Sequence, residues 1–171
     1  MPSKILTLQE TFIKDNLSFN TSTGVLSWTK GGRGRRGGVG AEAGYLNKSA
    51  GYRMVGCAGT DLLSHRIAWF LHHGVWPQDQ IDHINHNRLD NRLINLQDVT
   101  HYLNQQNASQ RTDNTSGVTG VNWHQRDRKW VVRIYIDGMR KQLGCYTDFF
   151  EACCARKSAE VKYKYHPNHG K

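Results

Sequence analysis

The sequence predicts a mixed α+β protein made of two units joined by a polar linker. Residues 81–107 (IDHINHNRLDNRLINLQDVTHYLNQQN) combine an Asp-His pair with a series of Asn residues. Residues 118–146 divide into three short runs of alternating apolar and polar residues, followed by a helical pattern that starts at Asp148. Between them, residues 107–116 (NASQRTDNTS) contain Ala108 as their one apolar residue. We therefore expect a first unit over residues 1–106, a linker over 107–116 and a second unit over 117–171.

The charge of the chain predicts a polyanionic partner. The 171 residues include 23 Lys and Arg against 14 Asp and Glu, for a net charge of +9. Residues 117–171 alone contain eleven basic against five acidic residues. Because these charges are scattered through sequence that can fold, nucleic acid is the simplest expected partner.

Composition also limits where the protein is expected to act. No run of 18 apolar residues occurs, and Met1–Leu6 lacks the apolar core of a signal peptide. None of the four cysteines forms a C-x-x-C pair. We expect a cytoplasmic protein with reduced cysteines and no membrane partner.

The first unit is expected to combine short strands with a helix. Residues 24–28 read as a strand, and residues 43–63 alternate Gly, aromatic and apolar residues as short antiparallel strands do. Ser64 is predicted to cap a helix that ends at Gly74, because the apolar residues between them recur at helical spacing.

A glycine-rich stretch at residues 31–38 carries Arg33, Arg35 and Arg36. Three guanidinium groups on such a backbone predict a loop that contacts phosphates or the minor groove of DNA. A solvated surface loop is the alternative, and the sequence does not separate the two.

The residue types in 81–107 predict metal-assisted hydrolysis of a phosphodiester. The Asp82 carboxylate can hold a hard divalent cation, and His83 can take a proton from water near neutral pH. The Asn95 carbonyl can fix the tautomer of His83, while Asn104 offers a second neutral oxygen ligand. The alternative is that these Asn and Asp residues simply form turns.

These residues, taken together, resemble the HNH endonuclease family, in the subgroup of phage and intron-encoded homing endonucleases. The residues that carry the resemblance are Asp82-His83-Ile84, Asn87, Asn91, Leu93, Asn95-Leu96, Val99-Thr100 and Asn104, preceded by the helix HRIAWFLHHG. The resemblance implies a site built from a two-stranded hairpin and a helix that grip one metal ion (a ββα-metal unit). Many relatives carry His at the position of Asn104 and an Asp-Gly turn at Asn85-His86, so His86 is either a turn residue or a phosphate contact.

Carried over by position, the resemblance assigns Asp82 and Asn104 as metal ligands, His83 as general base and Asn95 as the residue that orients it. With one carboxylate in the shell, one Mg²⁺ or Mn²⁺ per site is expected. The products would carry 5′-phosphate and 3′-hydroxyl ends. We expect Arg88 and Arg92 to contact either DNA phosphates or surface acids.

Alternation predicts the faces of the three strands in the second unit. One face should cover the helix that follows Asp148, whose small residues permit close approach. The residues expected on that face are Val121, Trp123, Trp130, Val132, Ile134, Ile136, Leu143 and Cys145. The opposite face should be basic and hydrogen-bonding, and should expose Asn122, His124, Arg133, Tyr135, Arg140 and Gln142. A sheet with such a face can lie in the major groove of DNA.

The second unit is similar to the AP2 DNA-binding domain through Gly120-Val121, Lys129-Trp130, Leu143-Gly144 and the Ala-rich helix. The resemblance implies that the sheet reads DNA with the six exposed residues given above. Several of these are Asn, His or Gln where plant members carry Arg or Trp, so sequence preference is not carried over. A sheet that braces the first unit and contacts only phosphates is the alternative.

The sequence thus predicts a homing-type, site-specific endonuclease acting on double-stranded DNA in the cytoplasm of a phage-infected bacterium. A monomer would nick one strand, and a weak homodimer could cut both. A non-catalytic DNA-binding regulator on a nuclease-like scaffold is the alternative, and RNA binding is less favoured because Tyr135 is the one aromatic residue expected on the exposed sheet face.

Overall fold

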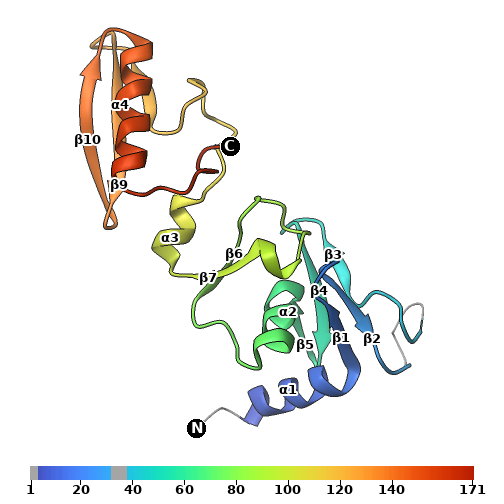
Figure 1. Ribbon diagram of the computed structural model, residues 1–171. Coiled ribbons are helices and arrows are strands. Elements are labelled where there is room, and N and C mark those ends of the chain that lie inside the picture. Colours follow the sequence, from blue (N-terminus) through green and yellow to red (C-terminus); the bar gives the residue numbers. More distant parts are fainter. Residues whose placement is uncertain (1–3, 32–37) are drawn as a thin grey trace. The chain divides into compact units, whose positions relative to one another are not determined.

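The computed structural model describes residues 4–31 and 38–171, and these divide into two compact units, Met1–Val99 and Thr100–Lys171 (Figure 1). Helices and small antiparallel sheets occur in both, in agreement with the predicted α+β class. The predicted contact residues Arg33, Arg35 and Arg36 lie outside the described residues.

Two small sheets form the scaffold of the first unit. Helix α1 (Lys4–Asn16) leads directly into the hairpin of β1 (Leu17–Asn20) and β2 (Val25–Trp28). Strands β3 (Tyr45–Asn47), β4 (Tyr52–Cys57) and β5 (Thr60–Leu63) follow as an antiparallel sheet in that order. The short antiparallel strands predicted for residues 24–28 and 43–63 are therefore confirmed.

Helix α2 (Ser64–His73) ends as predicted but begins differently. Gly74 has a φ of 74°, and its N–H donates to the Phe70 carbonyl, so glycine terminates the helix in the left-handed conformation. Ser64 was predicted to be the N-cap, and this is wrong. Leu63 occupies that position with an extended backbone, and the buried Ser64 Oγ has no hydrogen-bond partner among the described residues.

The core of the first unit lies where α1, α2 and both sheets meet. Ile13, Leu26, Val55, Ile67 and Phe70 are all buried in one cluster. A second, smaller cluster supports the antiparallel pair of β6 (Gln80–His83) and β7 (Leu96–Val99) against α2. It contains Ala68, Ile81 and Leu96. This second cluster fixes the strand that ends at His83.

The second unit contains a three-stranded antiparallel sheet covered by one helix. Its elements are α3 (His101–Gln106), β8 (Val121–His124), β9 (Lys129–Ile136), β10 (Met139–Tyr146) and α4 (Phe149–Lys162). The strand order is β10-β9-β8. Asp137 and Gly138 join β9 to β10 with φ values of 51° and 76°, as the predicted Asp-Gly hairpin requires.

Most residues predicted to face α4 pack in its core, but Trp123 is 42% exposed and packs on the Trp130 ring at the edge, and Cys145 departs after a bulge in β10. Val121 and Val132 pack with Ala152, and Ile134 and Ile136 pack with Ala159. The register shifts between Gln142 and Gly144. An inserted residue reverses the alternation that follows it, so the prediction for Cys145 is wrong. Cys145 is exposed, and Tyr146 packs on the core in its place.

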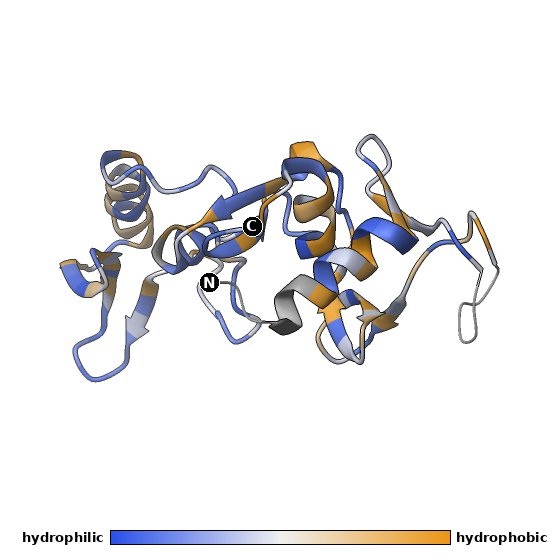
Figure 2. Ribbon diagram, turned by 90° about the horizontal axis from the view of Figure 1, so that it is seen from below, coloured by the Kyte–Doolittle hydropathy of each residue, from blue (hydrophilic) through white to orange (hydrophobic). Residues whose placement is uncertain are grey.

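Hydrophobic and hydrophilic residues are mixed along the helices (Figure 2). Within the described part of the chain, no helix is long and apolar enough to cross a membrane. All four cysteines are free.

Candidate active site

Asp82 and His83 are brought to the end of a strand and are buried there. In the β6–β7 pair, Asp82 lies opposite Gln97 and His83 lies opposite Leu96. Asp82 is 8% exposed and His83 is 4% exposed. The Asp82 Oδ2 accepts a hydrogen bond of 2.8 Å from Gln97 Nε2. Burial of two such polar side chains is costly unless hydrogen bonds or a ligand satisfy them, and this favours a functional role.

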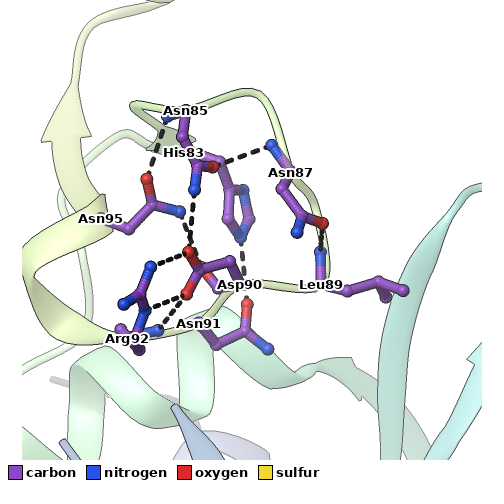
Figure 3. Close-up of polar contacts among 8 residues, drawn as sticks. All are labelled: His83, Asn85, Asn87, Leu89, Asp90, Asn91, Arg92 and Asn95. Atoms are coloured by element: carbon purple, nitrogen blue, oxygen red, sulfur yellow. Dashed lines mark hydrogen bonds and ion pairs between the residues drawn. The ribbon is translucent and has the colours of Figure 1, made fainter. Parts of the chain in front are cut away.

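The loop that follows His83 is held by its own Asn and Asp side chains (Figure 3). The Asn85 side chain accepts a hydrogen bond from the backbone N–H of Asn87, and the Asn87 side chain accepts one from Leu89. His86 adopts a φ of 63°, which marks it as a turn residue. The expectation that Asn residues form turns therefore holds for Asn85 and Asn87, within the same loop that carries the buried site.

Asn95 ties the two ends of this loop together. Its Oδ1 accepts from the backbone N–H of Asn85 at 2.9 Å, and its Nδ2 donates to the Asp90 carbonyl at 2.8 Å (Figure 3). The Asn95 backbone carbonyl also accepts from Ile84 N–H. Asn95 thus fixes the path of the backbone on both sides of the loop.

Asn91, rather than Asn95, makes the hydrogen bond to the imidazole. Asn91 Oδ1 lies 3.0 Å from His83 Nε2, and Asn91 is itself buried (Figure 3). With the amide oxygen as acceptor, Nε2 carries the proton and Nδ1 carries the basic lone pair. The sequence motif contains both Asn residues, but spacing alone does not show which of them reaches the ring.

The surroundings of His83 keep it neutral. Burial lowers its pKa, and this outweighs the opposing effects of the Asn91 hydrogen bond and of the Asp82 and Asp90 carboxylates. The ring also packs edge-on against His65, at 5.0 Å between centroids. His65 is buried, which lowers its pKa to about 3, so it stays uncharged beside His83. An imidazole that is neutral at pH 7 is able to accept a proton.

Asp90 and Arg92 stiffen the far side of the loop. The Arg92 guanidinium binds both carboxylate oxygens of Asp90, at 2.8 and 2.6 Å. This pairing lowers the pKa of Asp90 to about 2. The β1–β2 turn approaches the same segment closely, since a Cβ on Gly24 would lie 2.4 Å from the backbone nitrogen of Arg92. The loop is therefore held both internally and by a neighbouring hairpin.

Comparison with known families adds an independent observation to this geometry. Residues 63–106 match the family model of the HNH endonuclease. No curated protein and no solved structure matches the chain. The matched segment begins at the end of β5 and includes the whole buried site of Asp82, His83, Asn91 and Asn95. The match supports nuclease activity in general and a nucleic-acid substrate.

The HNH segment extends through α3, which carries Asn104. Thr100 caps this helix by accepting a hydrogen bond from the N–H of Leu103. The helix belongs to the second compact unit, Thr100–Lys171. Among the described residues, no group of three His, Cys, Asp or Glu side chains is arranged to hold a metal ion.

The two loop arginines contact protein groups. Arg88 donates to the Ala50 carbonyl at 3.0 Å, and its guanidinium lies 4.9 Å from the centroid of the Tyr52 ring. Arg92 binds Asp90, as described above, and the contact of either arginine with DNA stays a prediction. Arg88 instead ties the loop of residues 84–95, which we name the HNH loop, to the turn between β3 and β4.

In the second unit, the six residues predicted to lie on the exposed sheet face share one face of the sheet. Arg133 lies opposite Gln142, and Tyr135 lies opposite Arg140, in the β9–β10 register. Asn122 and His124 extend the face on β8. All six are exposed except Arg133, which is half-buried. The face therefore offers cationic and amide groups to solvent.

Sequence reasoning missed a buried polar cluster beside this sheet. Arg156 on α4 is 2% exposed, and its Nε donates to Glu160 at 2.8 Å. Its Nη1 donates to the Arg133 carbonyl at 2.7 Å, and its Nη2 lies 3.0 Å from His169 Nε2. The helical spacing of Arg156 and Glu160 signals that pair. Nothing in the sequence predicts the contact with His169.

Proposed function

We propose that the protein is a site-specific, divalent-metal-dependent DNA endonuclease of homing type. The observation that carries the proposal is the buried, neutral His83, hydrogen-bonded to Asn91 and next to Asp82, within a segment that matches the HNH endonuclease family. A scaffold without catalysis has no need to bury an Asp-His pair and hold its imidazole in one tautomer.

His83 acts as the general base in this proposal. Asn91 holds the proton on Nε2, which leaves Nδ1 to take a proton from the attacking water. Asn95 is a positioning residue, because it touches the backbone of the loop rather than the ring. The products carry a 5′-phosphate and a 3′-hydroxyl.

The available donors fit a hard divalent cation. Asp82 supplies a carboxylate, a ligand suited to Mg²⁺ or Mn²⁺, and the family resemblance assigns the amide oxygen of Asn104 as a further donor of the same hard type. When bound, such an ion supplies charge neutralisation at the scissile phosphate and stabilises the leaving 3′ oxygen. Gln97 orients the Asp82 carboxylate through its hydrogen bond to Oδ2.

The second unit selects the site in this proposal. Its exposed sheet face carries Arg133 and Arg140, which suit guanine, and Asn122 and Gln142, which suit adenine. A three-stranded sheet on one helix is the architecture expected of an AP2-like domain, and such a sheet can lie in the major groove.

A nicking assay tests the proposal. Supercoiled plasmid and genomic DNA of a bacterial host are incubated with the protein in Mg²⁺, in Mn²⁺ and in EDTA. The wild type is compared with His83→Ala and with the matched control His72→Ala, which removes an exposed imidazole from α2. We expect discrete, metal-dependent nicks from the wild type and from His72→Ala, and none from His83→Ala. If all three proteins bind DNA equally and none cuts it, the protein is a non-catalytic DNA-binding regulator.

A further inference from the structure

A cavity of about 470 Å³ lies within the second unit, beside the sheet. It is open on one side and lined by residues from 105–111, β8, β9 and β10, by Arg156 of α4 and by the C-terminal segment at Tyr165 and His169. All of these belong to the unit Thr100–Lys171. The cavity includes four of the six residues of the exposed sheet face, namely Asn122, Arg133, Tyr135 and Arg140.

The walls of the cavity are fixed by hydrogen bonds along an open strand edge. β8 pairs with β9 only as far as Val132, so the next carbonyls of β9 lack a strand partner. Arg156 donates to the Arg133 carbonyl, and the Tyr165 hydroxyl donates to the Tyr135 carbonyl at 2.6 Å. The C-terminal segment is joined to residues 105–111 by the bond from Gly170 N–H to the Ala108 carbonyl. The cavity is thus part of the folded unit.

Its charge is strongly one-sided. Arg111, Arg133, Arg140 and Arg156 line it, and none of the described residues that line it is Asp or Glu. Arg156 is neutralised by Glu160, and Arg111 pairs with Asp113. Arg133 and Arg140 form no ion pair with any described residue. Two unneutralised guanidinium groups in a concave site favour a phosphate-bearing ligand.

The remaining lining selects for more than an inorganic anion. Tyr135, an aromatic residue that is 53% exposed, lines the cavity, and Asn122 in the same lining has an amide with both donor and acceptor. Aromatic rings stack on nucleobases, and amides bind their edges. A volume of about 470 Å³ lies within the range of small-ligand sites.

We propose that this cavity binds a nucleoside phosphate, with the phosphate at Arg133 and Arg140 and the base at Tyr135 and Asn122. The nucleoside phosphate is either a free nucleotide or one nucleotide of a bound DNA strand. The second source rests on the DNA binding proposed above, and the first does not. Neither source depends on cleavage at His83.

Calorimetric titration of the full chain tests the proposal and separates the two sources. The probes are the four deoxynucleoside monophosphates, a six-nucleotide single strand, a duplex and inorganic phosphate. Arg140→Gln is compared with Lys141→Gln, which makes the same charge change at the next residue of β10, outside the cavity lining. We expect Arg140→Gln to weaken binding of a monophosphate or the single strand about tenfold, and Lys141→Gln to leave it close to wild type.

A second pair of variants distinguishes the cavity from the open sheet face. Ser109→Trp fills the cavity from residues 105–111 and leaves every arginine in place, and Thr112→Trp adds the same bulk outside it. We expect Ser109→Trp to lose binding of the monophosphate or single strand while keeping the duplex, and Thr112→Trp to keep both. Melting curves of all variants establish that they are folded.

Each outcome decides the proposal. Saturable binding of monophosphates that is weakened about tenfold in Arg140→Gln and lost in Ser109→Trp supports a free nucleotide. The same losses for the single strand alone support a nucleotide within DNA. Equal affinity for inorganic phosphate and monophosphates overturns the proposal, as does equal binding by Ser109→Trp and Thr112→Trp. If the protein nicks DNA but binds neither a monophosphate nor the single strand through the cavity, only this inference is overturned. If it binds nucleotides but does not nick DNA, only the proposed endonuclease is overturned.

Discussion

The HNH loop of the first unit and the sheet face of the second use polar side chains in opposite ways. In the loop, His83, Asn91 and Asn95 are buried and are hydrogen-bonded within the protein. On the sheet, Arg133 and Arg140 are bound by no acid among the described residues. Chemistry needs groups that are fixed before the substrate arrives, whereas recognition needs groups whose partners are supplied by the ligand. Changes in the loop should therefore alter stability and rate, and changes on the face should alter affinity.

The largest expected effect concerns the uncharged His65 behind the loop. Its pKa is about 3 in the folded state and about 6.5 when unfolded, so the unfolded state binds the extra proton as the pH falls below 6.5. The contribution of neutral His65 to the free energy of unfolding is fully present above pH 6.5 and is lost as the pH falls toward 3. Between pH 6.5 and 4 the loss should be about 3 kcal/mol.

Urea unfolding at several pH values measures this dependence. His65→Phe keeps a ring in the cluster and removes the titration, so its free energy of unfolding should fall less steeply than that of the wild type. His72→Phe, an exposed site, should follow the wild type. His83 and His169 titrate in all three proteins, so they do not affect the difference. Parallel curves for wild type and His65→Phe would show that His65 titrates normally.

The next effect concerns the support that the β1–β2 turn gives to the loop. Gly24 and Gly59 both have positive φ, at 75° and 86°, and alanine is strained at either position. A Cβ at Gly24 would also lie 2.4 Å from the Arg92 nitrogen, whereas nothing lies within 4 Å at Gly59. Gly59→Ala should cost about 1 kcal/mol, and Gly24→Ala about 2 kcal/mol more.

Urea unfolding measures both variants, and a nicking assay follows the loop. Gly24→Ala should reduce nicking because it displaces the backbone of Asn91 and Arg92, while Gly59→Ala should keep it. Equal stability of the two variants would mean that the hairpin yields without moving the loop.

The positions of the strands and helices were largely predictable, because periodicity and turn residues are local signals. Gly74 ends α2, Asp137-Gly138 joins β9 to β10, and the six residues of the sheet face share one side. The error at Cys145 has a specific cause. The alternation of apolar and polar residues gives no sign of the residue inserted before Gly144, and each residue after this bulge faces the side opposite to the one predicted.

The contacts of the site were less predictable than its residue types. The partner of the imidazole is Asn91, whereas Asn95 binds the backbone of Asn85 and Asp90, and spacing in the sequence does not separate the two. Arg156 and His169 are thirteen residues apart in the sequence, and their contact depends on the path of the C-terminal segment after α4. Such contacts follow from tertiary structure and have no local pattern.

Asn91 offers a smaller effect that tests the fixed loop directly. Asn91→Leu removes the partner of His83 Nε2 and should lower the nicking rate at saturating DNA about ten- to a hundredfold, with unchanged DNA affinity. Leu89→Ala truncates an exposed side chain in the same loop, keeps the backbone N–H that binds Asn87, and should stay close to wild type. Asn91→Asp keeps an acceptor and adds a charge, so it should raise the pKa of His83 and move the acid limb of the pH–rate profile upward. An unchanged profile would contradict the role of Asn91.

The smallest expected effect falls on the sheet face. Arg133→Gln should weaken DNA binding and leave the nicking rate at saturating DNA unchanged. If Arg133 contacts a phosphate, the slope of the logarithm of the binding constant against the logarithm of the salt concentration should become shallower by about 1. Arg126→Gln makes the same change at a side chain that is 91% exposed in the β8–β9 turn, and it should retain the wild-type slope.

Competition between the preferred site and unrelated DNA then separates base contacts from phosphate contacts. Because only base contacts distinguish sequences, a drop in affinity confined to the preferred site shows that Arg133 reads a base, and a uniform drop shows that it meets the backbone. A lower nicking rate at saturating DNA would contradict the division between a preorganised loop and a recognition surface.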